Sequence, residues 1–170
     1  MQKGDFQKDV FVHRNKMYRF ALSYLKNEEE AKDVVQEVLI KLWETRSELE
    51  KVNNIEAWCM TLTRNKSLDA LKRAGRKRNE KLEIHHEPAH ATNHSPLQVV
   101  TEKESVENVK KIADELPEKQ KTAFTLREIQ GYSYLEICDI MEISMSQVKV
   151  NIFRARNTIK DELKKRYSYE

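Results

Sequence analysis

Apolar residues recur at helical spacing along most of this chain, and no other feature constrains its fold as strongly. Strands would show as runs of alternating apolar and polar residues bounded by glycine or asparagine turns, and the sequence contains no sustained run of that kind. With only 3 Gly and 3 Pro among 170 residues, few positions would interrupt a helix. The sequence therefore predicts an all-α protein.

The helical pattern breaks over one long stretch, residues 82–101. Histidine, asparagine, serine and two prolines disturb any period there, which is typical of a flexible linker. We therefore expect two small helical domains, residues 1–81 and 102–170, joined by that linker. Pro117 is expected to open a helix and Gly131 to end it. The predicted helices, with ends accurate to several residues, span about 7–26, 28–46, 54–78, 102–116, 117–130, 134–141 and 145–163.

The last helix has two faces of different character. One carries the apolar stripe that a helix buries against its own domain, namely Val148, Ile152, Ala155, Ile159 and Leu163. Roughly opposite lie Ser146, Gln147, Val150, Phe153, Arg154 and Asn157. A valine and a phenylalanine on a solvent face indicate a partner there. The DNA major groove is such a partner, because Gln and Arg donate to base edges while Val and Phe contact thymine methyl groups.

The segment before this helix completes a helix-turn-helix. Ser144 and Gln147 have the S-x-x-Q spacing of a capping box, which would fix the start of the final helix. One side of the preceding short helix is expected to carry Leu135, Ile137, Cys138 and Met141. A plain helical hairpin with solvated charges is the alternative, and the exposed Val150 and Phe153 argue against it.

Charged residues gather by sign, although the net charge is only +3. One cluster is acidic and consists of Glu28, Glu29, Glu30, Asp33, Glu37 and Glu44. Another is basic and consists of Lys72, Arg73, Arg76, Lys77, Arg78 and Lys81. Clusters of opposite sign indicate partners of opposite charge.

We expect neither a metal site nor an enzyme. His86, His90 and His94 are spaced by four and would align on a helix, but Pro88 argues against a helix there. The sequence contains no G-x-S-x-G, no Gly-rich phosphate loop and no C-x-x-C. Catalytic residues and cofactors are therefore not expected.

The placement of the two cysteines and the length of the apolar runs indicate the cellular compartment of the protein. Cys59 and Cys138 lie far apart inside apolar helical patterns, so we expect buried thiols in a reducing environment. The first residues lack a signal-peptide pattern, and no run reaches the about 18 apolar residues of a membrane span. The sequence predicts a soluble cytoplasmic protein without direct membrane insertion.

Two blocks of the sequence resemble one known family. The segment from Asp33 to Trp43, the pair Ala57-Trp58 and the segment from Arg64 to Arg73 look like region 2 of extracytoplasmic-function (ECF) sigma factors. The segment Leu116-Pro117-Glu118-Lys119-Gln120 and the terminal helix pair look like region 4 of the same family. The resemblance covers about residues 10–80 and 102–166, in the family's order.

The resemblance implies a bacterial transcription initiation factor with three partners: core RNA polymerase, promoter DNA and an anti-sigma factor, which in this family is often membrane-bound. Docking on polymerase would use the acidic helix, at Asp33, Gln36 and Glu37, where carboxylates would repel DNA phosphates. Region 2 would recognise and melt the minus-ten element with Asn53, Asn65, Asp69, Lys72, Arg73 and Arg76. Region 4 would recognise the minus-thirty-five element with Ser146, Gln147, Lys149, Val150, Phe153 and Arg154.

Four positions limit what the resemblance implies. Glu142 stands where the family has a glycine, so the turn there is expected to be shaped differently. Trp58 is expected to fill the core beside Leu62 rather than stack on a base. Gln147 and Val150 replace residues that are frequent in the family, so its promoter sequence does not carry over.

Two other functions stay open at this point. One is a two-domain helix-turn-helix transcriptional regulator that binds a symmetric operator and does not dock on polymerase. The other is a helical adaptor whose basic segments bind acidic proteins. The segment from Asp33 to Trp43, followed by a helix with Asn65 and Asp69, favours the sigma factor, because a regulator has no need of it.

Overall fold

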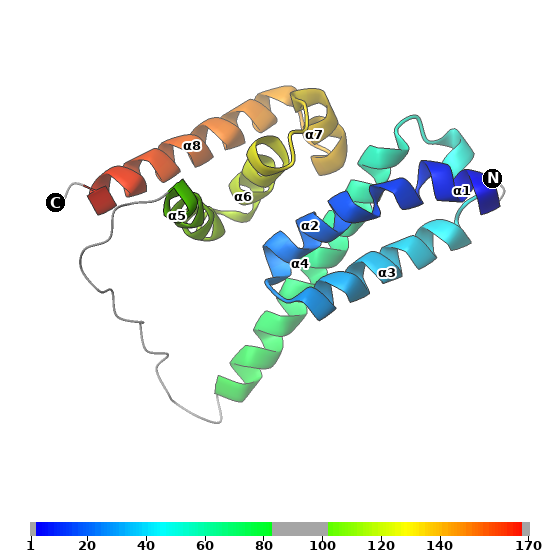
Figure 1. The fold of residues 1–170 in the computed structure, drawn as a ribbon, viewed down its shortest axis with the longest axis horizontal. Helices are drawn as coiled ribbons and strands as arrows, with labels where there is room; N and C mark the ends of the chain where they lie inside the picture. Colours follow the sequence, from blue (N-terminus) through cyan, green and yellow to red (C-terminus); the bar gives the residue numbers. More distant parts are fainter. Residues whose placement is uncertain (1–2, 83–101, 168–170) are drawn as a thin grey trace.

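The computed structural model describes residues 3–82 and 102–167, and the regular structure within these ranges is entirely helical, as predicted (Figure 1). The N-terminal half, residues 3–82, comprises α1 (Lys3–Asp9), the 3₁₀ turn η1 (Phe11–His13), α2 (Arg14–Leu25), α3 (Glu28–Glu44), the 3₁₀ turn η2 (Leu49–Lys51) and α4 (Ile55–Leu82). The C-terminal half, residues 102–167, comprises α5 (Glu102–Asp114), α6 (Glu118–Phe124), the π-helical turn η3 (Thr125–Ile129), α7 (Tyr134–Met141) and α8 (Met145–Tyr167).

The first predicted helix is divided into three pieces. The sequence predicted one helix over residues 7–26, whereas α1 ends at Asp9 and α2 begins at Arg14. Between them Val10 leaves regular helix geometry, with φ −112° and ψ −53°. The break brings the Phe6 ring edge-on to Trp43 of α3, with centroids 5.1 Å apart, while Val10 stays fully buried. Phe6 and Val10 are both apolar and lie four positions apart, so helical periodicity alone does not reveal the break between α1 and α2.

Both helices of the helix-turn-helix begin with a capping box. At α7 the Ser133 hydroxyl accepts the Glu136 N–H, and the Glu136 carboxylate accepts the Ser133 N–H. At α8 the predicted box is present, since the Ser144 hydroxyl accepts the Gln147 N–H at 3.3 Å. The Gln147 side-chain oxygen accepts the Ser144 N–H at 3.0 Å. These bonds satisfy backbone donors that a helix start leaves without partners.

The turn between α7 and α8 keeps the left-handed residue that a glycine would normally supply. Glu142 has φ 54° and ψ 43°, so the expectation of a differently shaped turn was wrong. Its N–H bonds the Cys138 carbonyl and closes the helix. Met141 before it is buried, and Ile143 after it packs against the core. This packing on both sides holds a backbone geometry that costs a non-glycine residue about 1 kcal/mol.

The buried side of α7 differs from the predicted one. Ile137, Ile140 and Met141 are buried, while Leu135 is 69% exposed, so its predicted place on the buried side was wrong. Leu135 and Ile137 are two positions apart, which sets them on different sides of a helix, whereas intervals of three and four keep residues on one side.

The two halves share a buried core. One apolar cluster runs from α1, α2, α3 and α4 into α6, α7 and the start of α8, and α7 packs directly on α4 (Figure 1). A second cluster lies between α5, α6 and α8. The predicted linker, apart from Leu82 at the end of α4, lies outside the described residues, and so do His86, His90 and His94.

Candidate nucleic-acid and protein interfaces

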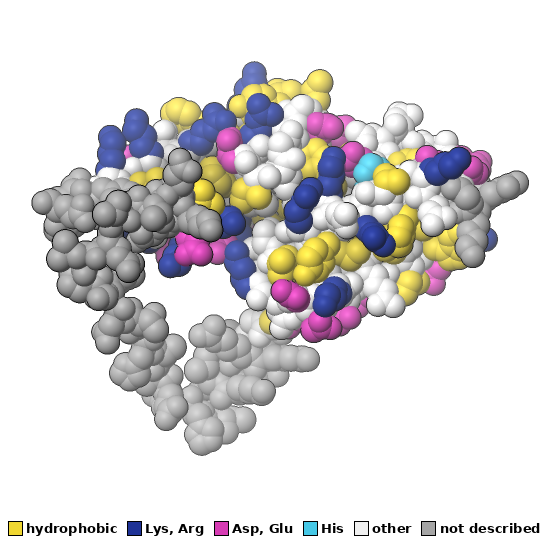
Figure 2. Space-filling view, in the orientation of Figure 1, with side chains coloured by type: hydrophobic (Ala, Val, Ile, Leu, Met, Phe, Trp, Pro, Cys, Tyr) yellow, Lys and Arg dark blue, Asp and Glu magenta, His cyan; other side chains and the backbone are white. Residues whose placement is uncertain are grey.

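Helix α8 presents the two faces that its sequence predicted. Val148, Ile152, Ala155 and Ile159 are buried, and Leu163 is half-buried. On the other face Val150 is 44% and Phe153 65% exposed, among the exposed Ser146, Gln147, Lys149 and Arg154. Figure 2 shows cationic and apolar side chains together along the upper edge of the molecule, where α8 and α7 lie. We call these six exposed residues the α8 face.

The start of the α8 face is held in place by polar contacts. The Ser146 and Ser144 hydroxyls lie 2.9 Å apart, and the Asn151 amide donates to the Gln147 carbonyl at 2.8 Å. Farther along, the Arg156 guanidinium donates to the Glu128 carboxylate of η3 at 3.0 Å. The capping box occupies the Gln147 side-chain oxygen, which leaves the amide hydrogens of Gln147 as the donors suited to a base edge.

An acidic stripe lies on α3. Asp33, Gln36 and Glu37 are exposed, whereas Val34, Val35, Val38 and Leu42 of the same helix are buried. Asn27 caps the helix by accepting the N–H groups of Glu29 and Glu30 at 2.9 and 3.1 Å. A hydrogen bond from Lys66 of α4, at 2.8 Å, holds the pKa of the Glu37 carboxyl below its ordinary value. The stripe is therefore negatively charged at neutral pH and fixed on a packed helix.

A polar stripe runs along α4 beside the acidic one. Asn65, Asp69, Lys72 and Arg73 are exposed at helical spacing on one side. Arg76 continues this series within α4, but its side chain is outside the described structure. Thr63 and Ser67 on the opposite side, and Thr61 beside Ile140 of α7, each donate a hydroxyl hydrogen to the carbonyl four residues earlier at 2.8–2.9 Å. These bonds let polar residues face the core at little cost.

Trp58 lies on this polar stripe, and its predicted place in the core was wrong. Its side chain is 39% exposed, while the neighbouring Ala57, Cys59 and Met60 are buried. Trp58 and Asn65 are seven positions apart, close to two helical turns, which sets both on one side of α4. The helical spacing of Trp58 to Asn65 and Asp69 indicates the exposed side, although large indole rings are usually buried. We define the α4 stripe as Trp58, Asn65, Asp69, Lys72 and Arg73.

The loop before α4 adds one predicted residue. Asn53 is exposed, and the next residue, Asn54, caps α4 by accepting the Ala57 N–H at 2.9 Å. Asn53 is therefore held one residue from a fixed helix start, near the Trp58 end of the α4 stripe.

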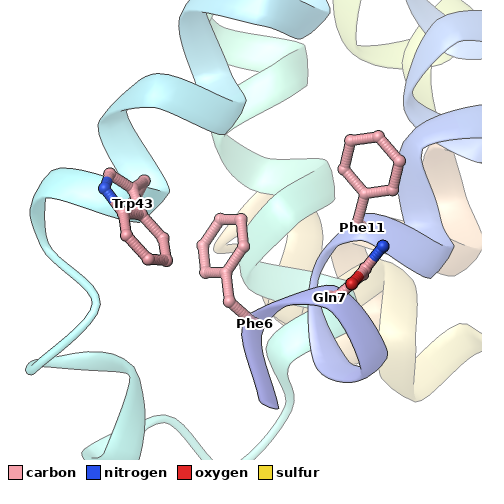
Figure 3. A pocket seen from close by; sticks show the side chains of 4 residues that line it. All are labelled: Phe6, Gln7, Phe11 and Trp43. Atoms are coloured by element: carbon pink, nitrogen blue, oxygen red, sulfur yellow. The ribbon is translucent and has the colours of Figure 1, made fainter. Parts of the chain in front are cut away.

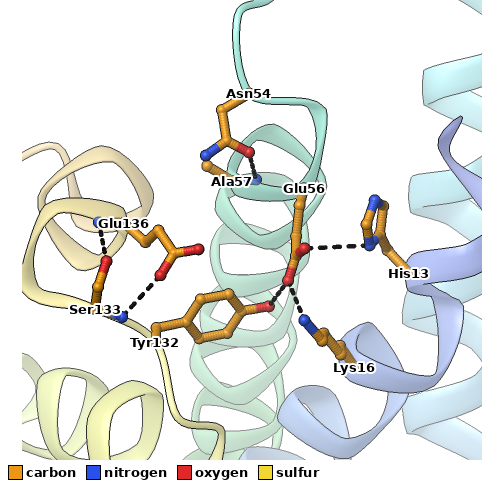
Figure 4. A network of polar contacts seen from close by, with 8 residues as sticks. All are labelled: His13, Lys16, Asn54, Glu56, Ala57, Tyr132, Ser133 and Glu136. Carbon is orange, nitrogen blue, oxygen red and sulfur yellow. Dashed lines mark hydrogen bonds and ion pairs between the residues drawn. The ribbon is translucent and has the colours of Figure 1, made fainter.

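Glu56 is the centre of a polar network between the halves (Figure 4). Its carboxylate accepts hydrogen bonds from Lys16 of α2 and, at 2.8 Å, from the Tyr132 hydroxyl of the C-terminal half. His13 Nδ1 lies 3.6 Å away. Burial alone would raise the pKa of Glu56, but the hydrogen bonds from Lys16 and Tyr132 outweigh it and lower that pKa. Burial, together with the bond to Glu56, raises the pKa of Tyr132.

Among the hollows on the described surface, two adjoin the N-terminal half. One, of about 250 Å³, is lined by Phe6, Gln7, Phe11 and Trp43 at the end of α3 (Figure 3). The other, of about 420 Å³, lies between α2 and the helices α5 and α6, and its lining includes Leu22, Lys26, Asp114 and Lys121. The second hollow is a groove to which both halves contribute.

Residues 3–82 and 102–167 also contain metal-ligand side chains, long helices and thiols. No group of three His, Cys, Asp or Glu side chains there could hold a metal ion. No helix there is long and apolar enough to cross a membrane. Both cysteines are free, and burial raises the pKa of the Cys59 thiol to about 12.

Comparison with known proteins identifies both halves. The sequence matches the family models of sigma-70 region 2 over residues 11–77 and of sigma-70 region 4 over residues 107–159. The RNA polymerase sigma-H factor of Pseudomonas aeruginosa is 28% identical over 170 residues, which cover 94% of this chain and 88% of that protein. The ECF RNA polymerase sigma factor SigE of Mycolicibacterium smegmatis is also 28% identical, over 159 residues and 94% of this chain. This chain spans 62% of the length of that SigE.

Two solved structures have the same fold. The sigma factor RpoE of Bartonella quintana, crystallised with the anti-sigma factor NepR, matches with a TM-score of 0.71 and 25% identity, over 94% of this chain and 97% of that one. CnrH, solved with the cytosolic domain of CnrY, matches with a TM-score of 0.66 and 22% identity, over 95% and 89%. Sequence and structure thus place the two regions in the predicted order, and the chain belongs to the ECF sigma factors of the sigma-70 family.

Proposed function

We propose that this protein binds core RNA polymerase and directs promoter-specific transcription initiation. One observation carries the proposal: a single chain presents an acidic stripe on α3 and, separately, two faces suited to nucleic acid, on α4 and α8. A regulator that binds an operator needs only the α8 face. We therefore also propose that the protein acts in the cytoplasm, where chromosomal promoters are found.

The α8 face is proposed to bind the minus-thirty-five element in the major groove. Arg154 and the Gln147 amide hydrogens are donors for base edges, and Val150 and Phe153 offer apolar contact to thymine methyl groups. Lys149 is suited to a phosphate, because a lysine ammonium binds as a point charge. The positive end of the helix dipole, at Ser146, also favours a phosphate.

The α4 stripe is proposed to bind and melt the minus-ten element. Unpaired bases stack on aromatic rings in proteins that hold single strands, and Trp58 offers an exposed ring. Asn65 has both donor and acceptor groups for a base edge. Lys72, Arg73 and Arg76 supply positive charge for the backbone, and Asn53 is proposed to contact a base beyond the end of the stripe. Asp69 would exclude phosphate from its own position by charge repulsion.

The acidic stripe on α3 is proposed to dock on core polymerase. A surface of Asp33, Gln36 and Glu37 repels nucleic acid and suits a basic protein surface. Lys66 orients the Glu37 carboxylate from one side. Because α3 packs on both α2 and α4, docking there would fix the α4 stripe relative to polymerase.

We also propose control by an anti-sigma factor that contacts both domains, residues 1–81 and 102–170. The relative RpoE was solved in complex with such a factor. The groove between α2, α5 and α6 supports the proposal, because a partner lying in it would touch both halves at once.

Charge reversal on α3 tests the docking role. The variant Asp33→Lys/Glu37→Lys should weaken binding of the full chain to core polymerase at least tenfold, measured by fluorescence anisotropy, because two attractive charges become repulsive. The matched control Asp9→Lys/Glu28→Lys makes the same change in net charge at exposed residues off the stripe and should bind normally. Equal affinity of the two variants would show that the stripe is not the docking surface.

A further inference from the structure

The first turn of α8 contains a closed set of hydrogen bonds around Gln147. Its side-chain oxygen accepts the Ser144 N–H at 3.0 Å and the Ser144 hydroxyl hydrogen at 3.2 Å. An amide oxygen has two lone pairs, so these two bonds use its whole capacity as an acceptor. The side chain of Gln147 can therefore offer a ligand only its two amide hydrogens.

Ser146 keeps the Ser144 hydroxyl from turning away. The two serine hydroxyl oxygens lie 2.9 Å apart. Because the hydroxyl hydrogen of Ser144 points to Gln147, the hydrogen between the two serines comes from Ser146. The Ser144 oxygen also accepts the Gln147 N–H at 3.3 Å, so its hydrogen and both its lone pairs are used. Turning the Gln147 amide over would break bonds at both residues.

Freeing the Gln147 oxygen for a base would undo the helix cap. The Ser144 N–H would lose the partner that the capping box supplies. Loss of a capping bond changes the equilibrium between a formed and a frayed helix start by roughly fivefold. The Asn151 amide also holds this turn, because it donates to the Gln147 backbone carbonyl at 2.8 Å. The direction of the Gln147 amide is thus set in the free chain.

Gln147 lies where a base edge would meet it. It is exposed, it is the third residue of α8, and Val150 of the α8 face follows it by about one turn. In helix-turn-helix proteins the residues at the N-terminal end of the second helix contact base edges in the major groove. A side chain in this place takes part in base recognition.

A glutamine held in this way cannot make its usual pair with adenine. In that pair the side chain donates to N7 and accepts from the N6 amino group. With the oxygen of Gln147 occupied, an amino group of adenine or cytosine would meet only donor hydrogens. Guanine O6 and thymine O4 are keto oxygens in the corresponding place in the major groove, and both are acceptors.

We infer that the capping box of α8 also sets promoter specificity. Gln147 selects a base with a keto oxygen in the major groove, guanine or thymine, and rejects a base with an amino group there, adenine or cytosine. The inference rests on the proposed contact between the α8 face and the minus-thirty-five element, and it names the chemical class of base at one position of that element.

The variant Gln147→Glu keeps the cap and exchanges the outward group. Glutamate is a standard residue at this position of a capping box, so one carboxylate oxygen accepts the Ser144 N–H. The other oxygen then faces outward as an acceptor, and no donor remains. Asn157→Asp is the matched control, because it makes the same amide-to-carboxylate change at an exposed residue farther along α8. Both variants should keep the far-ultraviolet circular dichroism spectrum of wild type.

Selection from randomised DNA measures the base preference. The template is a genomic fragment from which wild-type holoenzyme initiates, with its minus-thirty-five region randomised, and the DNA that each holoenzyme binds is sequenced. At one position wild type should favour keto bases on one strand by about fivefold or more. Gln147→Glu should reverse the order of base pairs there, because a carboxylate accepts from an amino group and repels a keto oxygen. Asn157→Asp should keep the wild-type order.

The reversal distinguishes a donor-only amide from one that pairs with adenine. If Gln147 also accepted from adenine N6, Gln147→Glu would keep that bond, so the order of base pairs would flatten without reversing. That result would overturn the inference, as would an order unchanged at every position, since Gln147 would then contact no base. Failure of all three holoenzymes to select any minus-thirty-five sequence would overturn the proposed function of the α8 face, and the inference with it.

Discussion

Val150 and Phe153 illustrate how single residues decide the interpretation of a helix. Both are apolar and exposed on α8, although the same helix buries four other apolar residues completely or nearly so. Helical spacing alone assigned each residue to its side, so this part of the candidate site was predictable from the sequence. Trp58 was not predicted correctly, because large indole rings are usually buried and its spacing to Asn65 was a weaker signal.

Arg154 and Lys149 are expected to act differently on DNA. If Arg154 contacts a base, Arg154→Ala should cost about 1–3 kcal/mol and relax preference at one promoter position. If Lys149 contacts a phosphate, Lys149→Ala should weaken binding to all DNA sequences alike. It should also reduce the slope of the logarithm of affinity against the logarithm of salt concentration by about one unit. Holoenzyme binding to matched and mismatched minus-thirty-five duplexes at several salt concentrations distinguishes them. Unchanged binding of both variants would mean that the α8 face does not contact DNA.

Trp58 is expected to stack on an unpaired minus-ten base. Trp58→Ala should weaken holoenzyme binding to a single-stranded minus-ten oligonucleotide by about 1–3 kcal/mol, and Trp58→Phe should restore most of it, because any aromatic ring can stack. Binding to core polymerase should stay unchanged in both. A Trp58→Phe variant as weak as Trp58→Ala would argue against stacking.

At the scale of elements, most helices were predictable and two irregularities were not. Capping residues and apolar stripes located α3, α7 and α8 within four residues of their observed ends. The break at Val10 and the π-helical turn η3 depend on contacts with other elements, such as Phe6 against Trp43 and Arg156 against Glu128. Local patterns carry no information about such contacts.

The α7–α8 turn offers a test of stored backbone strain. Glu142→Gly should raise the free energy of unfolding by about 0.5–1 kcal/mol, because glycine adopts the left-handed conformation freely. Lys26 is the internal comparison: it is also left-handed, at φ 55°, but binds Asp114. Lys26→Gly should therefore raise the free energy of unfolding by less than Glu142→Gly does. Urea unfolding measures both, and a destabilised Glu142→Gly would show that its side chain contributes more than the strain costs.

At the scale of the whole molecule, the order of the two halves was predictable but their packing was not. Each half has its own helical pattern in the sequence, whereas the contacts between halves join residues 76 to 98 positions apart. Tyr24 and Thr122 carry no pattern that marks them as partners. Apolar spacing identified Ile137 and Met141 as buried, without indicating that α4 covers them.

Promoter-specific initiation by purified components tests the central claim most directly. The protein is added to core RNA polymerase with genomic DNA fragments of its own organism as templates, and transcript start sites are mapped by sequencing. We predict discrete starts downstream of a shared pair of elements, absent with core alone and strongly reduced with Asp33→Lys/Glu37→Lys. Start sites identical to those of core alone would contradict the assignment of this protein as an initiation factor.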